Sequence, residues 1–173
     1  MFSLRYFIDF EANQHGHGPY LLKELCIMDV ENPLRNLCMI FAPPKPWCQT
    51  TPEERRTYLY NQQKLHHLNW YEGNYIFDAK VVTGQIYWFI GSINNAVFFA
   101  QNMQKTKILQ ELLPELNIIN YADLDSCCAE LTIAKLPSAP NYISCTYRNH
   151  GRHSCAVLKC FRLCLHYNNT FRS

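Results

Sequence analysis

SLRYFIDFE, residues 3–11, carries the main evidence for the fold. Its aromatic and β-branched residues are typical of a β-strand, and the stretch ends close to two carboxylates, Asp9 and Glu11. Side chains two residues apart point to the same face of a strand. The stretch therefore predicts an opening strand that presents an acidic pair near its end.

Two further strands are predicted directly after it. A turn rich in Asn, Gly and Pro over residues 13–19 leads into LLKELCIMDV, residues 21–30. Asn32-Pro33 turns the chain again before NLCMIFAP, residues 36–43. Three strands joined by short turns indicate an antiparallel meander.

Strands and helices are predicted in alternation after the meander. Thr51-Pro52-Glu53-Glu54 has the form of a helix start, and this helix is expected over residues 52–66. QIYWFIGS, residues 85–92, is interpreted as a buried fourth strand, followed by a helix over residues 93–104. An extended segment at residues 117–124 and a helix over residues 153–166 come next. The pattern predicts a single α/β domain over residues 1–173, with a mixed sheet flanked by helices.

Composition and charge limit the classes of protein that fit. Hydrophobic residues make up 48% and charged residues 17% of the 173 residues, which excludes disorder over most of the length. The net charge of +2 is too small to predict nucleic-acid binding by itself. The sequence shows no secretion signal and no apolar run of the ~20 residues that span a bilayer, so we expect a cytoplasmic or nuclear protein without membrane contact. In that setting nine cysteines are better interpreted as thiols or metal ligands than as disulfides.

FIDFE, residues 7–11, resembles the first motif of the ribonuclease-H-like 3′–5′ exonuclease superfamily of the DEDDh type, whose first strand ends in Asp-x-Glu. The order of the expected elements is similar to that superfamily over nearly the whole chain. The resemblance implies a ribonuclease-H-like, mixed five-stranded sheet that contains the antiparallel meander. In such enzymes several carboxylates hold two Mg²⁺ ions, which activate water and stabilise the leaving oxygen.

The other two motifs of this superfamily are altered. IGSINNAVFF, residues 90–99, is similar in position to the second motif and has Asn95 in place of its Asp. HSCAVLKC, residues 153–160, resembles the third motif and has Lys159 in place of its Asp, with His153 one position away from the usual His. A lysine among the metal ligands adds positive charge where the reaction needs negative charge. Ordinary exonuclease activity is therefore disfavoured.

A closer resemblance is to the Maelstrom-type branch of the superfamily and to related insect or mobile-element domains. In that branch Glu, Cys, His and Cys bind zinc in place of the acidic set, and the matching residues here are Glu11, Cys145, His150 and Cys155, with His153 as an alternative to His150. Zinc favours thiolate and imidazole in a tetrahedral shell, and three of the four residues lie in one short segment. Four protein ligands would make the zinc structural.

The leading functional hypothesis is a catalytically degenerate nuclease-fold domain with a structural zinc. It would bind RNA, or a protein partner, in RNA silencing or in mobile-element or viral nucleic-acid metabolism, as the resemblance implies. The basic residues expected to contact nucleic acid are Arg148, Arg152 and Lys159. A second group, in which basic residues alternate with aromatic ones, comprises Arg55, Arg56, Tyr58 and Tyr60.

Two alternatives stay open. One is an active nuclease that depends on Mg²⁺ or Mn²⁺, with an acidic site and a histidine base formed by Asp9, Glu11, either Asp123 or Asp125, and His153. The other is a protein-interaction module without nucleic-acid binding, with exposed aromatic residues as its interface. Cleavage of a labelled oligonucleotide and binding of RNA at low salt separate the three hypotheses.

Overall fold

The computed structural model describes residues 4–124, 128, 132–140 and 155–172. Six strands form one mixed sheet in the order β4-β3-β2-β1-β5-β6. The strands are β1 (Leu4–Asn13), β2 (Leu21–Asp29), β3 (Asn36–Ala42), β4 (Tyr75–Ile76), β5 (Ala96–Ala100) and β6 (Ile118–Asn120).

Four longer helices accompany the sheet in the described ranges. They are α1 (Pro52–Asn61), α2 (Ala79–Ile90), α3 (Met103–Leu112) and α5 (Ala156–Phe171). The shorter turns are η1 (Trp47–Gln49), the π-helical η2 (Gln62–His66), η3 (Tyr121–Asp123) and η4 (Ile133–Lys135). None of the described helices combines the length and the apolar character needed to cross a membrane.

The sheet contains the predicted meander. β2 pairs antiparallel with both β1 and β3, while β5 pairs in parallel with the other edge of β1 and β6 in parallel with β5. β4 is two residues long and pairs in parallel with β3. The α/β fold with a mixed sheet flanked by helices is confirmed. The expectation of five strands was wrong, because a two-residue strand leaves no periodic signal in a sequence.

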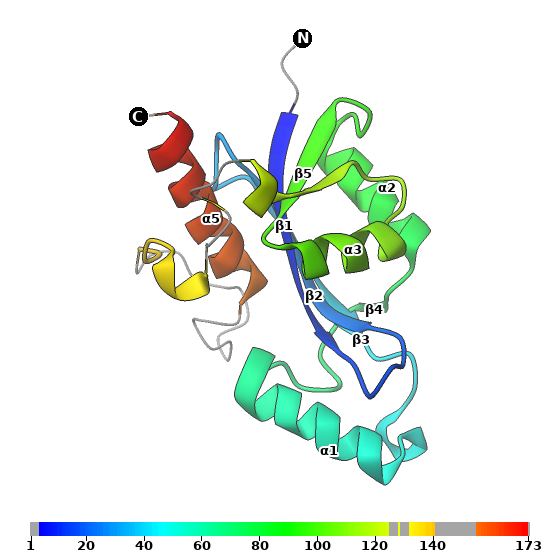
Figure 1. Cartoon of the computed structure of the whole chain (residues 1–173). Coiled ribbons are helices and arrows are strands. Elements are labelled where there is room, and N and C mark those ends of the chain that lie inside the picture. The colour runs from blue at the N-terminus through cyan, green and yellow to red at the C-terminus, as the bar shows by residue number, and fades with distance from the viewer. Residues whose placement is uncertain (1–3, 125–127, 129–131, 141–154, 173) are drawn as a thin grey trace.

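The alternation of side chains along β1 separates two cores. One core lies between the sheet and helices α2 and α3, and its β1 residues are Tyr6, Ile8 and Phe10. The other core lies under α5 and contains Phe7. Figure 1 shows α5 on one face of the sheet and α2 and α3 on the other. Since Asp9 and Glu11 follow Phe7 at steps of two, they lie on the face that α5 covers.

QIYWFIGS is helical, contrary to the prediction of a strand. Its residues up to Ile90 form the second half of α2. Asp78 caps the start of α2, because its Oδ1 accepts the backbone N–H of Val81 at 3.0 Å, and Gly91, with φ 81°, is the C-cap. The buried positions of α2 recur at helical intervals and are Val82, Thr83, Ile86 and Ile90. The aromatic residues that suggested a buried strand, Tyr87 and Trp88, are exposed. Aromatic content without the helical period was therefore misleading.

The helix expected over residues 93–104 was wrong as well. β5 covers Ala96–Ala100, and α3 begins only at Met103. The short run AVFFA has the β-branched and aromatic character of a buried strand. Because residues 85–92 were interpreted as the strand, residues 96–100 were assigned to the helix expected after it.

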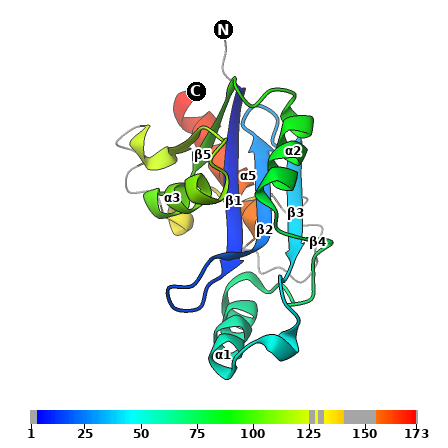
Figure 2. The same ribbon diagram turned by 90° about the vertical axis from the view of Figure 1, so that its right-hand side faces the viewer.

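α1 lies at one end of the sheet, apart from the layers on its two faces (Figures 1 and 2). The expected helix over residues 52–66 is confirmed as α1 continued by the π-turn η2. Thr51 and Glu54 form a capping box at its start, with Pro52 in the first turn. The start of α1 is therefore stabilised by its own capping residues rather than by packing on the sheet.

Candidate functional site

Strand pairing brings three carboxylates together under α5. Asp9 and Glu11 follow each other on one face of β1, and Glu24 on β2 is paired directly opposite Glu11. Asp9 and Glu24 are fully buried. Burial of an ionised carboxylate is costly unless the charge is paired and hydrogen-bonded. The geometry therefore requires cationic or hydrogen-bonding partners at this point.

Two lysines supply the cations. Lys105 of α3 donates to Asp9 Oδ1 and, at 3.1 Å, to the backbone oxygen of Phe10. Lys159 of α5 donates to Glu11 Oε1, and its Nζ lies 3.9 Å from Asp9 Oδ2. Each carboxylate of β1 therefore has its own ammonium group. We refer to Asp9, Glu11, Lys105 and Lys159 as the ion-pair cluster.

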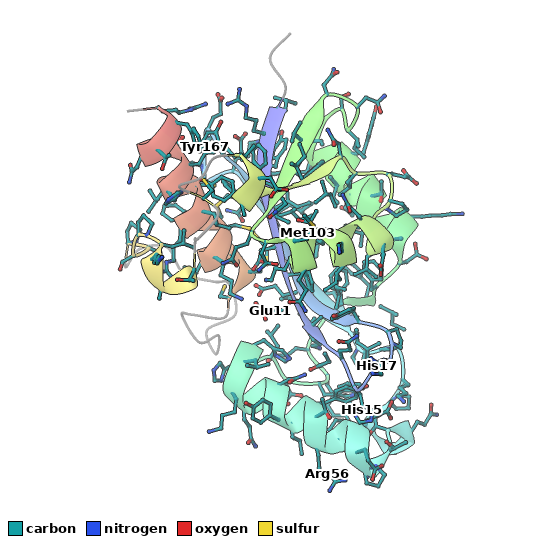
Figure 3. All side chains as sticks on the ribbon, viewed as in Figure 1. Glu11, His15, His17, Arg56, Met103 and Tyr167 are labelled. Atoms are coloured by element: carbon teal, nitrogen blue, oxygen red, sulfur yellow. The ribbon has the colours of Figure 1, made fainter. Side chains whose placement is uncertain are left out.

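Helix starts position both lysines. Asn102 Oδ1 accepts the backbone N–H of Lys105 at 2.9 Å, which begins α3 directly after β5 and places Lys105 in its first turn. Lys159 occupies the first turn of α5, which starts after Cys155. Because β5 runs parallel to β1, its carboxyl end lies at the same end of the sheet as Asp9. Figure 3 shows Glu11 near the ends of α3 and α5, at the end of the sheet that faces α1.

Burial and charge act against each other in this cluster. Burial raises the pKa of the Glu11 carboxyl, and the nearby Lys159 and Lys105 lower it only in part. Burial also lowers the pKa of Lys159, but the carboxylates of Asp9 and Glu11 outweigh this effect, so that its pKa is raised overall. Lys159 is therefore an ammonium at neutral pH. Asp9 Oδ2 is buried and accepts no hydrogen bond from the residues that the structure describes.

Glu24 has a structural task that the sequence did not reveal. Its Oε2 accepts the backbone N–H of Ala156 at 2.9 Å, at the start of α5. Cys155, the N-cap residue of α5, provides no side-chain cap. A carboxylate at a helix N-terminus satisfies an otherwise unpaired N–H and favours the helix dipole. Glu24 thus fixes α5 on the sheet, and only the pairing of β1 with β2 could have shown that it faces the same site.

The thiols beside Glu24 belong to the same buried region. Glu24 Oε1 lies 3.7 Å from Cys38 Sγ and 3.8 Å from Cys155 Sγ. Cys26 and Cys160 are fully buried nearby, and the hydrogen bond with Cys160, together with burial, raises the pKa of the Cys26 thiol. Cys26 and Cys160 therefore pack as neutral thiols in the core under α5.

The predicted second-motif residue lies at the wrong end of the sheet. The backbone oxygen of Asn95 accepts the N–H of Leu4 at 2.9 Å, at the start of β1. Asp9 follows Leu4 by five residues, which is roughly 16 Å along a strand. Asn95 therefore cannot join the site, and Lys105 is the residue that the helix after β5 brings to Asp9. The misplaced strand at 85–92 explains why Lys105 was missed.

The predicted zinc ligands lie only partly in the described ranges. Cys145, His150 and the alternative His153 fall outside the residues that the structure describes, so they stay predictions. Within the described residues, no group of three or more His, Cys, Asp or Glu side chains could hold a metal ion. Glu11 is bonded to Lys159, whose positive charge competes with a cation at the same oxygen. Glu11 as a zinc ligand stays a prediction, as do Cys145, His150 and Cys155.

The other predicted site residues are spread over the chain. Arg148, Arg152 and Asp125 lie outside the described residues. Lys159 is buried in the ion-pair cluster, so its ammonium is engaged by carboxylates. Asp123 accepts a hydrogen bond from Asn120 Nδ2 at 2.8 Å in the turn after β6.

Each β1 carboxylate of the ion-pair cluster is paired with a lysine. Two-metal hydrolysis needs carboxylates that leave cation positions open for Mg²⁺ and the attacking water. Here two ammonium groups neutralise the β1 carboxylates. An ammonium group has neither the charge nor the open coordination positions to activate water as a divalent ion does.

Neither the known protein-family models nor the curated proteins give a match to this chain.

Proposed function

We propose that this chain is a nuclease-fold domain that has lost two-metal catalysis and binds single-stranded nucleic acid without cleaving it. A ribonuclease-H-like fold is supported by the meander β1–β2–β3, by its parallel extension through β5 and β6, and by α5 beside β1. The acidic pair lies at the carboxyl end of the first strand, where this hypothesis expects it. Fold likeness alone does not carry function.

One observation carries the loss of catalysis: Lys105 and Lys159 are bonded to the two carboxylates that would hold metal ions. For Mg²⁺ to bind, it would have to displace both ammonium groups from a buried position. Removing one partner of a buried ion pair costs on the order of 3–5 kcal/mol. The lysines therefore act as fixed replacements for the two metal charges.

A degenerate nuclease fold retains a surface suited to nucleic acid only if cationic and aromatic side chains remain exposed. Arg56 and Tyr60 of α1 are exposed, so part of the second predicted group stays accessible. Such residues contact phosphates and stack on unpaired bases. These features support a binding role for RNA or single-stranded DNA.

The test is a combined cleavage and binding assay on the purified chain. A fluorescent single-stranded RNA oligonucleotide is incubated with protein and Mg²⁺ or Mn²⁺, and intact oligonucleotide is quantified alongside fluorescence anisotropy at low salt. We expect binding without cleavage, and the same negligible cleavage rate for wild type and Glu11→Gln. Glu115→Gln, which removes an exposed carboxylate on the loop after α3, is the matched control.

Metal-dependent cleavage that is present in wild type and Glu115→Gln but lost in Glu11→Gln would overturn the proposal in favour of an active nuclease. Absence of both cleavage and binding would overturn the nucleic-acid role and leave the protein-interaction module. Binding without cleavage supports the proposal.

A further inference from the structure

We infer that the outward face of α1 and η2 is the surface that binds single-stranded nucleic acid, with Tyr60 stacking on a base and Arg56 and Lys64 contacting phosphates. This inference deepens the proposed function and rests on it. It moves the expected contact surface from residues near the C-terminal end to a helix that stands apart from the sheet (Figure 1).

The three side chains follow one another at four-residue intervals. Arg56 and Tyr60 share one face of α1, and Lys64 follows in the π-helical η2. All three are exposed, and Tyr60 is 58% exposed. Arg56 and Tyr60 lie roughly 6 Å apart along the axis of α1, and Lys64 follows Tyr60, so an extended strand meets one cation before and one after the stacking ring.

The charges of this face are available to a ligand. Arg56 pairs with Glu53 at 3.3 Å, but the Arg56 side chain is 78% exposed, and such surface pairs are weak. Lys64 has no acidic partner among the described residues. The neighbouring basic groups are engaged elsewhere, because Lys45 binds Glu54 at 2.9 Å. Figure 3 shows Arg56 on the side of α1 that points away from the sheet.

The buried side of α1 fixes this face rigidly. Tyr58 stacks on Trp70 with ring centroids 4.7 Å apart, and Asn61 Nδ2 donates to Asn13 Oδ1 at 3.1 Å. The structure thereby divides the predicted group in two. Tyr58 belongs to the core, and Arg55, which donates to Thr50 Oγ1 at 3.0 Å, belongs to the helix start. A surface that is already ordered loses little conformational entropy on binding.

A buried histidine completes the attachment of the turn. His66 Nδ1 accepts the backbone N–H of Leu68 at 3.0 Å, so its Nε2 carries the proton and donates to Asn13 Oδ1 at 3.1 Å. His66 follows the exposed Lys64 by two residues and directly precedes His67, whose backbone is left-handed with φ 57°. The π-turn therefore holds Lys64 in place without using its charge.

Charge distinguishes this face from the other exposed aromatic surface. Trp88 on α2 is 84% exposed, with Tyr87 beside it. The only basic residue of α2 is Lys80, and Arg35, which donates to the backbone oxygen of the neighbouring Phe89 at 2.6 Å, is 43% exposed and paired with Asp29 at 3.2 Å. A polyanion is attracted by cations next to the stacking ring, so complementarity favours Tyr60 over Trp88.

The test measures affinity of the full chain for a fluorescent 12-nucleotide single-stranded RNA by anisotropy over a range of salt concentrations. Tyr60→Ala is expected to weaken binding roughly 5- to 150-fold, the effect of one lost base stack. Tyr60→Phe is expected to retain binding, because it keeps the ring. Arg56→Ala and Lys64→Ala are each expected to lower the slope of log affinity against log salt by about one.

Trp88→Ala and Lys80→Ala are the matched controls on α2, and both are expected to bind as wild type. If wild type binds the RNA but the Arg56→Ala/Tyr60→Ala/Lys64→Ala variant binds equally well, this surface is wrong while the proposed function stands. If wild type does not bind, both fall. An equal loss in Trp88→Ala and Tyr60→Ala would also contradict the inference, because it would indicate non-specific adhesion to exposed aromatic rings.

Discussion

At the scale of single residues, buried polar groups join β2 to the segment before β4. Lys23 is buried and donates to the backbone oxygens of Phe41, Trp70 and Glu72 at 3.0, 3.0 and 2.8 Å. Burial lowers the pKa of Lys23 to about 8, although Glu72 acts in the opposite direction. Three acceptors match the three donors of an ammonium group. Lys23 therefore has a structural role.

His166 gives the fold a predictable dependence on pH. Its Nδ1 lies 2.9 Å from the hydroxyl of Tyr121, and burial lowers its pKa below the usual 6.5. The unfolded chain therefore binds a proton before the folded chain does as the pH falls below about 6.5. We expect the contribution of His166 to stability to be present above that pH and to be lost as the pH falls through the folded pKa.

Urea unfolding of wild type and His166→Gln between pH 5 and 7.5 checks this prediction. The variant is expected to lose less stability on acidification than wild type, since it lacks this titrating group. Parallel pH profiles for the two proteins would show that His166 is not perturbed. His17, in the turn between β1 and β2, provides the control variant His17→Gln.

Part of the candidate site was accessible from residue patterns alone. The spacing of Asp9 and Glu11 predicted two carboxylates on one strand face, and Lys159 was recognised as a lysine at a would-be ligand position. Lys105 and Glu24 were not found. Their place depends on which helix follows β5 and on the register of β1 with β2, and neither is a local property of the sequence.

At the scale of elements, two glycines with opposite environments test the packing of β4 and α2. Gly73 precedes β4 with φ +127°, and a Cβ there would lie 2.1 Å from Ala42 N. Gly84 lies within α2, and a Cβ there meets nothing within 4 Å. Gly73→Ala is therefore expected to lower the free energy of unfolding by roughly 2–4 kcal/mol. Gly84→Ala is expected to raise it by about 0.5–1 kcal/mol.

Chemical denaturation of the two variants, compared with wild type, measures both effects. Gly84→Ala serves as the control for the added methyl group, because the chemical change is identical. Equal stabilities for the two variants would contradict the close approach of residue 73 to β3.

The elements also show where sequence patterns are sufficient. The meander and α1 have strong local signals: apolar, aromatic and β-branched strand residues, prolines and a capping box. α2 was misjudged because its exposed face is aromatic, and the helical period of its buried residues extends back to Val82, before the segment that was considered. That single error displaced β5 and α3 and removed Lys105 from view.

At the scale of the whole molecule, the sheet brings together carboxylates and lysines from four elements. β1 and β2 supply Asp9, Glu11 and Glu24, while α3 and α5 supply Lys105 and Lys159. Strand order and register bring these residues together. The alternation of strands and helices in the sequence predicted the fold class but not this cluster. α1 lies at the same end of the sheet as Glu11, and Arg56 points away from the sheet (Figure 3).

The most direct test of the ion-pair cluster is a calorimetric titration of Mn²⁺ into wild type, Glu11→Gln and Glu115→Gln at neutral pH. If Lys105 and Lys159 replace the metal charges, the three proteins will give the same heats, without saturable binding that depends on Glu11. A saturable Mn²⁺ isotherm in wild type and Glu115→Gln that disappears in Glu11→Gln would contradict the account.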